Sequence, residues 1–282
     1  MNVRTVAIVT GAAGSMGSEC ARAIASLVDV VVITDRNGAA LALQHEALAH
    51  DALVEVVSLC GDLSHRTFIR ELVEGAAAVG EIKVLVHTAG LSPAMADWRD
   101  ILHVDLVVVA ELLNEVVEHV GVGAVAVCLA SISGHMGDFD AAVDAVLDSP
   151  LAPDLESRYE SVVGAAPESG NTYRLAKRGV IRLCERSAAA WGSRGARIMS
   201  VSPGLIDTAM GRLELEHQPI KTWLAKTTPL SAIRLDAETP LPGRIDDIAQ
   251  TVAFLCSDNA GFITGCDILV DGGLLGAIRN QN

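Results

Sequence analysis

Tyr173 and Lys177 lie four residues apart in a stretch, 171–191, whose pattern predicts a helix. Residues at this spacing project from one face of a helix. A phenol with a pKa of about 10 is a weak acid at neutral pH, and a neighbouring ammonium favours the phenolate and lowers that pKa. The pair could therefore carry a proton in a reaction, although the same spacing also occurs in surface pairs without a catalytic role.

Two hydroxyls, those of Ser131 and Ser133, follow the predicted strand 123–129. A hydroxyl at the end of a strand could polarise a carbonyl oxygen held in the crevice there.

A glycine-rich turn, TGAAGSMG over 10–17, joins the first predicted strand to a helical pattern over 18–27. Glycines let a backbone approach a pyrophosphate, whose charge is met by N–H groups at the helix N-terminus. An ordinary strand-to-helix loop can have the same glycines, so other signals must support a cofactor site. The candidate cofactor contacts here are Gly11, Gly14, Ser15, Met16 and Gly17.

Asp35 ends the second predicted strand, 18 residues after Gly17. A carboxylate there accepts hydrogen bonds from the adenosine ribose hydroxyls and repels a 2′-phosphate, which favours NAD over NADP. The adjacent Arg36 leaves NADP open, as does the alternative that Asp35 is a solvated strand end. After the third strand, Asp62 and Leu63 suit the adenine end of the same site, although Asp62 or Ser64 could instead cap a helix.

The pattern of the whole chain predicts one α/β domain over 1–282, a doubly wound parallel sheet of the Rossmann type. Short runs that are apolar on both faces alternate with helical stretches, and crossovers between parallel strands should be right-handed. The predicted strands are 3–9, 30–34, 53–59, 83–87, 123–129, 196–201 and 267–270.

Two segments depart from this alternation, an inserted segment at about 135–170 and a substrate loop at about 207–243. Both follow strands, at the edge where parallel sheets bind ligands. Residues 140–148 predict a short helix, and prolines at 150, 153 and 167 prevent a longer one. We expect this insertion to be a lid with apolar side chains touching substrate. The candidate substrate contacts are Ser131, Ser133, His135, Met136 and Tyr173.

Composition excludes several classes of function. Half of the 282 residues are apolar and 20% are charged, which is typical of a folded globular protein. A net charge of −14 and an aromatic content of 3% argue against nucleic acid and membrane partners. The eight histidines show no metal-ligand spacing, so we expect no metal site. No signal-peptide pattern or long apolar stretch is present, and we expect a soluble cytoplasmic protein.

The six cysteines are far apart in the sequence and form no Cys-x-x-Cys pair. The first four, Cys20, Cys60, Cys128 and Cys184, sit inside apolar runs. We expect them to be buried, reduced thiols and not disulfides or zinc ligands.

These residues together resemble the single-domain branch of the short-chain dehydrogenase/reductase family over essentially the whole chain. The resemblance implies that Tyr173 is the general acid/base, that Lys177 holds the nicotinamide ribose and tunes Tyr173, and that Ser131 binds the substrate oxygen. It also implies a second group of cofactor contacts. The motifs that carry it are 10–17, Asp62-Leu63, Thr88-Ala89-Gly90, Ser131, Tyr173-x-x-x-Lys177, 202–208 and 263–273. The implied further contacts are Thr88, Ala89, Gly90, Pro203, Gly204, Ile206 and Thr208. Of these, Thr208 would bond the carboxamide of the nicotinamide.

Three departures from the family pattern stand out. This chain has Ser15 at the position of the middle glycine in the family's glycine-rich turn. Read as Gly-x-x-Gly-x-x-Gly, the turn also fits the extended branch of epimerases and dehydratases. The asparagine often counted as a fourth catalytic residue is Asp105, which could serve the same proton relay or only fix its helix. Ser131 and Tyr173 are 42 positions apart, and a subset of bacterial hydroxysteroid dehydrogenase/carbonyl reductases is similar in this respect.

We therefore expect an NAD-dependent oxidoreductase that interconverts a secondary alcohol and a ketone, with a hydroxysteroid-like or other apolar carbonyl substrate. The alternative from another class is a nucleotide-binding regulator without turnover. The family's tetramer packs the Tyr-bearing helix and its neighbour against another subunit, where the insertion could lie. We therefore expect a homo-oligomer, a dimer or tetramer, with a dimer using the surface near 245–278.

Overall fold

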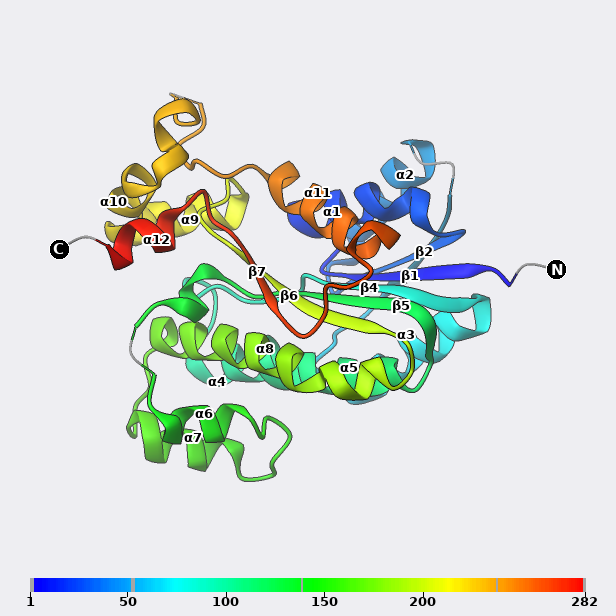
Figure 1. Ribbon diagram of the computed structural model, residues 1–282, viewed down its shortest axis with the longest axis horizontal. Helices are drawn as coiled ribbons and strands as arrows, with labels where there is room; N and C mark the ends of the chain where they lie inside the picture. Colours follow the sequence, from blue (N-terminus) through cyan, green and yellow to red (C-terminus); the bar gives the residue numbers. More distant parts are fainter. Residues whose placement is uncertain (1–2, 52–53, 138, 237, 281–282) are drawn as a thin grey trace.

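A computed structural model describes residues 3–51, 54–137, 139–236 and 238–280. Seven strands form one sheet, in the order β3-β2-β1-β4-β5-β6-β7, and every neighbouring pair is parallel (Figure 1). The strands are β1 (Thr5–Thr10), β2 (Val30–Asp35), β3 (Glu55–Cys60), β4 (Glu81–His87), β5 (Val120–Leu129), β6 (Arg197–Pro203) and β7 (Asp267–Val270).

The predicted fold class, a doubly wound parallel sheet in a single domain, is confirmed, and each of the seven predicted strands has its counterpart. Their bounds shift by a few residues: β1 begins at Thr5 and not at Val3, and β5 begins at Val120, before the predicted 123. Leu53, the predicted start of the third strand, lies outside the described residues.

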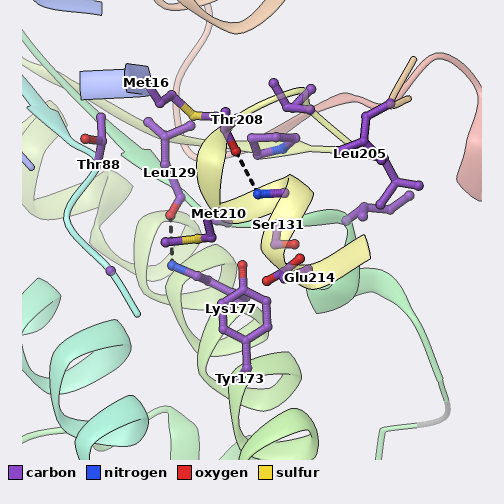
Figure 2. Close-up of a pocket in the computed structure, with 18 of the residues that line it drawn as sticks. Met16, Thr88, Leu129, Ser131, Tyr173, Lys177, Leu205, Thr208, Met210 and Glu214 are labelled. Atoms are coloured by element: carbon purple, nitrogen blue, oxygen red, sulfur yellow. Dashed lines mark hydrogen bonds between the residues drawn. The ribbon is translucent and has the colours of Figure 1, made fainter. Parts of the chain in front are cut away.

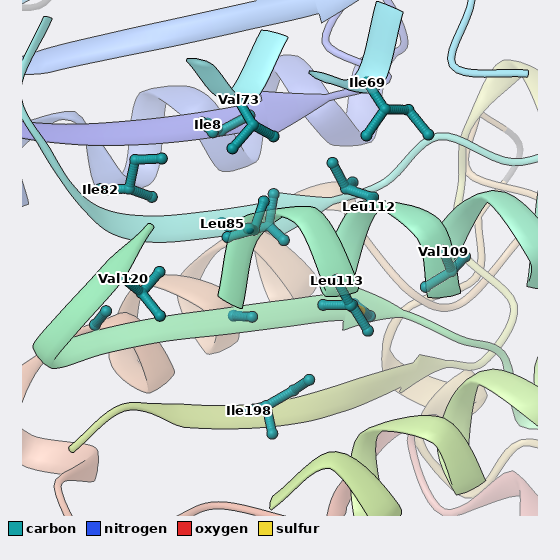
Figure 3. Packing of buried hydrophobic residues seen from close by; sticks show 14 of the residues in the cluster. Ile8, Ile69, Val73, Ile82, Leu85, Val109, Leu112, Leu113, Val120 and Ile198 are labelled. Carbon is teal, nitrogen blue, oxygen red and sulfur yellow. The ribbon is translucent and has the colours of Figure 1, made fainter. Parts of the chain in front are cut away.

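Helices cover both faces of the sheet because alternate strand residues point to opposite sides. On one face, Val6 and Ile8 of β1 pack with residues of α3, α5 and α8 (Figure 3). On the other, Ala7 and Val9 pack with α1, α2 and α11. The helices are α1 (Ser15–Ile24), α2 (Gly38–Asp51), α3 (Arg66–Val79), α4 (Trp98–Leu102), α5 (Val108–Val117), α6 (Ala141–Leu147), α7 (Leu155–Val163), α8 (Ser169–Gly192), α9 (Ala209–His217), α10 (Ile220–Thr227), α11 (Ile245–Cys256) and α12 (Leu274–Arg279).

The order of strands reverses between β1 and β4. The chain moves outward from β1 to β2 and β3, then returns to add β4 on the other side of β1. The connections after β1 and β4 therefore diverge and leave a crevice at the carboxyl ends of these strands, where ligands bind in open α/β sheets. Within the described ranges, no helix is both long and apolar enough to cross a lipid bilayer.

The insertion before α8 forms two short helices, α6 and α7 (Figure 1). The helix predicted over 140–148 is present as α6, and the Asp140 carboxylate at its N-cap accepts a hydrogen bond from the Ala142 N–H at 2.9 Å. The two helices pack against α4 and α8 through a buried apolar cluster. That cluster contains Trp98, Leu102, Leu106, Val146, Leu147, Leu155, Tyr159, Leu175 and Ala176.

Charged pairs align α6 along α8. The guanidinium of Arg178 binds both carboxylate oxygens of Asp144, at 2.5 and 2.6 Å, and Arg182 binds Asp148 in the same way, at 2.7 Å for both. Each helix presents its partners four residues apart, so both pairs form in one register. Bidentate pairs of this kind fix orientation as well as adding energy.

The expectation that the insertion is a lid touching substrate is wrong. None of its described residues, 135–137 and 139–170, lines the cleft at the carboxyl ends of the strands. The two paired arginines and the apolar cluster hold it against the outer side of α4 and α8 instead.

The cysteine expectation needs one correction. Cys20, Cys128 and Cys184 are buried free thiols as expected, but Cys60 is exposed, because it ends the edge strand β3. Its thiol lies 3.8 Å from the Arg36 carbonyl oxygen.

The double variant Asp144→Asn with Asp148→Asn should lower the stability of the protein. The Arg178 hydrogen bond holds the pKa of Asp144 below its usual range, so the pair stabilises the fold above the unfolded pKa of about 4 and less as pH falls. We expect a loss of about 1 kcal/mol at pH 7, or about 2–4 °C in Tm. Thermal melts from pH 7 to 3 measure it, and the difference should shrink below about pH 4.

Asp154→Asn is the matched control, since Asp154 is an exposed carboxylate of the same insertion without a side-chain capping bond. Equal melting temperatures for the double variant and the native protein at pH 7 would contradict a stabilising role of the two Asp–Arg pairs.

Candidate active site

The glycine-rich turn after β1 brings the N-terminus of α1 close to the end of β4. Gly11 has a φ of +67°, and a Cβ there would lie 2.7 Å from the Ala89 backbone nitrogen. A Cβ at Gly17 would lie 2.3 Å from the Gly11 carbonyl oxygen. Only glycine fits at these two positions, so the sequence of this turn is dictated by the close approach of its backbone.

The N-terminus of α1 suits a pyrophosphate. Its N-cap is Gly14, and no side chain caps the first turn, so the N–H groups of Ser15, Met16 and Gly17 have no capping partner within the described chain. Free N–H groups at a helix N-terminus attract anions. Ser15, where the family has glycine, is exposed with an ordinary negative φ and is accommodated without strain.

Asp35 lies beside this turn at the end of β2. Its Oδ2 accepts a hydrogen bond from the Ala13 N–H at 3.1 Å, and its Oδ1 accepts one from the Asn37 N–H at 2.9 Å. Each carboxylate oxygen can accept a second bond. The geometry therefore suits two ribose hydroxyls, while Arg36, the alternative partner for a 2′-phosphate, is exposed next to it.

Asp62 and Leu63 follow β3 next to Asp35. The Gly61 N–H donates to the Asp35 carbonyl oxygen at 3.1 Å, which links the ends of β2 and β3. The Asp62 carboxylate accepts from the Ser64 N–H at 2.9 Å, and this bond lowers its pKa. Neither Asp62 nor Ser64 caps α3, whose N-cap is His65, so the capping alternative is wrong.

A cleft opens at the carboxyl ends of β4, β5 and β6, beside the first turn of α1 (Figure 2). It brings together predicted residues from five separate parts of the chain. Those that line it are Met16, Thr88, Gly90, Ser131, Tyr173, Lys177, Pro203, Gly204, Ile206 and Thr208. Ala89 does not line the cleft and packs against the core beneath it.

Tyr173 extends from α8 toward Ser131 at the end of β5 (Figure 2). Burial raises the pKa of its phenol well above the usual range, and the carboxylates of Glu214 and Asp105 raise it further. A hydrogen bond with Ser131 has the opposite, smaller effect. In the protein alone the phenol is therefore protonated at neutral pH, and forming a phenolate requires positive charge nearby.

Lys177 supplies positive charge one helical turn away. Its Nζ lies 5.5 Å from the centre of the Tyr173 ring, 3.4 Å from the Leu129 carbonyl oxygen and 3.4 Å from Asp105 Oδ2. The Lys177 side chain is almost fully buried, so its charge acts in a medium where electrostatic effects are strong.

Asp105 is fully buried in a π-helical turn, His103–Val107, between α4 and α5. Its Oδ1 accepts a hydrogen bond from the Leu91 N–H at 2.7 Å, while Oδ2 faces Lys177 as an ion pair without hydrogen-bond geometry. Burial raises the pKa of Asp105, and Lys177 acts against that shift. The carboxylate therefore both fixes the loop after β4 and balances the charge of Lys177.

The hydroxyl of Ser131 is oriented by its neighbour. Ser131 Oγ accepts hydrogen bonds from the Ser133 N–H at 3.2 Å and the Ser133 hydroxyl at 2.9 Å. With both acceptor sites occupied, the Ser131 O–H is directed to donate elsewhere. Ser133 thus supports Ser131 from outside the cleft lining.

His135 and Met136, two candidate substrate contacts, do not line the cleft. His135 Nε2 lies 2.8 Å from Asp267 Oδ2 on β7, and the Met136 carbonyl oxygen accepts a bond from Arg174 at 2.9 Å. The Met136 side chain packs in an apolar cluster with residues of α10 and α12. Both residues therefore hold the chain after β5 in place.

Sequence reasoning missed part of the cleft. Glu214 and Lys221 line it from α9 and α10, beside a wall of apolar side chains. Both lie in the predicted substrate loop, but nothing in their spacing marks them as facing Tyr173. The missed lining residues are Leu91, Leu129, Ala130, Ile132, Leu205, Met210, Gly211, Glu214, Lys221 and Leu241. Among the residues that the structure describes, no cluster of His, Cys, Asp and Glu suits a metal ion.

Comparisons with known proteins agree on one family. A family model described as short chain dehydrogenase matches residues 5–143, and one described as Enoyl-(Acyl carrier protein) reductase matches 158–275. An uncharacterized short-chain type dehydrogenase/reductase of Sinorhizobium fredii is 30% identical over 278 residues, which are 95% of this chain and 43% of that protein. The chain thus spans less than half the length of that relative.

Two further proteins share nearly the full length. The 7alpha-hydroxysteroid dehydrogenase of Bacteroides fragilis is 28% identical over 95% of this chain and 93% of its own. A solved 7α-hydroxysteroid dehydrogenase, complexed with NADH and 7-oxo glycochenodeoxycholic acid, matches with a TM-score of 0.75 at 19% identity, covering 95% of this chain and 93% of its own. This structural match supports the fold of the chain.

The two family models together cover both ends of the sheet and the helix that carries Tyr173. The strand order and the cleft agree with that match. The chain belongs to the short-chain dehydrogenase/reductase family, whose members are oxidoreductases acting on hydroxy and keto compounds.

Proposed function

We propose that this protein is an NAD-dependent dehydrogenase that interconverts a secondary alcohol and a ketone. The observation that carries the proposal is the convergence of Ser131, Tyr173 and Lys177 on one cleft that also receives the N-terminal turn of α1. The apolar wall of the cleft supports a hydroxysteroid-like or other largely apolar carbonyl compound. That wall includes Leu91, Ile132, Leu205 and Leu241.

The residues present fit a dinucleotide. The N–H groups at the start of α1 would hold the pyrophosphate, Asp35 the adenosine ribose, and Thr208 with Ile206 the nicotinamide end. A bound nicotinamide cofactor would supply the hydride acceptor for alcohol oxidation and the hydride donor for ketone reduction. The close packing at Gly11 and Gly17 supports this assignment, because it leaves backbone in place of side chains where phosphates would lie.

The chain's own residues handle the proton. The Ser131 O–H donates to the substrate oxygen, and the Tyr173 phenolate accepts the proton of the substrate hydroxyl during oxidation. The Lys177 ammonium stabilises that phenolate, and a ribose held by Lys177 would keep it in place. In the reverse direction Tyr173 returns its proton to the carbonyl oxygen.

Tyr173→Phe should remove the proton carrier and leave the aromatic ring in its place. We expect kcat to fall by about 10²–10⁴, the range typical of a lost general acid or base. NADH formation across a panel of cyclic secondary alcohols measures the loss, and NAD titration by fluorescence checks that affinity is unchanged. Near-native turnover in the variant would exclude Tyr173 from the mechanism.

Asp35 should make the enzyme prefer NAD, because its carboxylate repels a 2′-phosphate. Asp35→Ala should raise the Kd for NAD and admit NADP, with the exposed Arg36 as partner for the added phosphate. Steady-state kcat/KM with the two cofactors measures both effects. Equal values for the native enzyme would contradict the preference.

Asp105→Asn should move the pH profile of alcohol oxidation. The Asp105 carboxylate raises the pKa of Tyr173, so its neutralisation lowers that pKa and shifts the acid limb of kcat to lower pH. The other charged groups around Tyr173 are Lys177, Glu214 and Lys221. A profile that stays in place while Tm falls would show that Asp105 has a structural role only.

A further inference from the structure

Glu214 is a carboxylate in the cleft that the proton transfer described above does not use. It projects from α9 toward Tyr173 and Ser131 (Figure 2), and its side chain is only 12% exposed. Of the charged groups that raise the pKa of Tyr173, Glu214 has the larger effect and Asp105 the smaller. Glu214 therefore lies within electrostatic range of the group that carries the proton.

Two contacts fix the position of this carboxylate. Oε1 accepts a hydrogen bond from the Ser92 hydroxyl at 2.8 Å, and Oε2 lies 3.1 Å from the Lys221 Nζ. Ser92 is fully buried in the loop after β4, and Lys221 is on α10. Two segments, the loop after β4 and α10, thus hold the carboxylate that α9 carries against the cleft.

The carboxylate still has acceptor capacity. Each oxygen can accept two hydrogen bonds, and Ser92 and Lys221 use one on each. Glu214 and Lys221 both line the cleft, so a bound molecule can reach an acceptor and a donor side by side. A neutral hydroxyl matches this pair because it donates to Glu214 and accepts from Lys221.

The same pair disfavours charged substituents at this position. Glu214 repels an anion and Lys221 repels a cation, and both side chains are more than three-quarters buried, so water screens them poorly. An apolar group at this position would leave an oxygen of the Glu214 carboxylate without a hydrogen-bond donor, which also weakens binding.

We propose that Glu214, together with Lys221, selects substrates that carry a second hydroxyl on the carbon next to the reacting carbinol, that is, vicinal diols and the matching hydroxyketones. This inference rests on the proposed dehydrogenase function. The apolar wall then holds the carbon skeleton, while Glu214 and Lys221 form hydrogen bonds with the neighbouring hydroxyl.

The test compares cis-1,2-cyclohexanediol with cyclohexanol as substrates for NADH formation by the purified protein. The native enzyme should show a kcat/KM per hydroxyl at least about tenfold higher for the diol, the gain expected from a hydrogen bond to a charged group. Glu214→Gln keeps the shape and removes the charge, so the ratio should fall to within about threefold of one.

Glu216→Gln is the matched control, since it removes the same charge from an exposed position of the same helix. Its ratio should equal the native one. Ser92→Ala removes one anchor of the carboxylate but no charge, and should lower the ratio less than Glu214→Gln. Thermal melts establish that each variant is folded.

Lys221→Gln provides a second test if the Glu214 variant does not fold. Without the ammonium, the cleft should accept trans-2-aminocyclohexanol better relative to cyclohexanol than the native enzyme does. A ratio near one in the native enzyme, or an unchanged ratio in Glu214→Gln, would overturn the role of Glu214 while leaving the dehydrogenase function standing. Absence of NADH from every alcohol, with NAD still bound, would overturn the dehydrogenase function and this inference with it.

Discussion

The buried charge of Lys177 is the interaction on which the active site depends. An ammonium taken out of water is costly unless an opposite charge and hydrogen-bond acceptors replace its hydration. Asp105 and the Leu129 carbonyl oxygen do so, and Asp105 also binds the backbone after β4. Gly90 is part of the same constraint, since a Cβ there would lie 3.1 Å from Asp105 Oδ1 and 3.2 Å from Lys177 Nζ.

The sequence was sufficient for the sheet and for the residues at its carboxyl edge. Burial on both faces requires apolar residues within each strand, and close backbone contact requires glycines within the turn after β1. Both constraints act on short runs of neighbouring residues. Ser131 was placed at that edge because it follows a strand, whereas the resemblance to the family placed Tyr173 and Lys177 beside it. Positions that depend on one local element were therefore predictable.

Features that depend on pairing between distant segments could not be predicted from the sequence. The Glu214 carboxylate is held at the cleft by a hydrogen bond that the hydroxyl of Ser92, 122 residues earlier, donates to it, and by the ammonium of Lys221. The insertion was expected over the substrate, yet it lies on α8. A signal for this was present: arginines at 178 and 182 and aspartates at 144 and 148 share a four-residue spacing, which matches one helix to the other. Cys60 was misjudged because an edge strand has the same apolar pattern as a central one.

The insertion also changes what the catalytic helix needs from other molecules. α8 is held between the sheet on one side and α6 with α7 on the other, all within one chain. A contact made by a tethered segment has a fixed, high effective concentration, whereas a contact between subunits weakens on dilution. These contacts to the helix that carries Tyr173 and Lys177 are therefore made within each molecule and do not weaken on dilution.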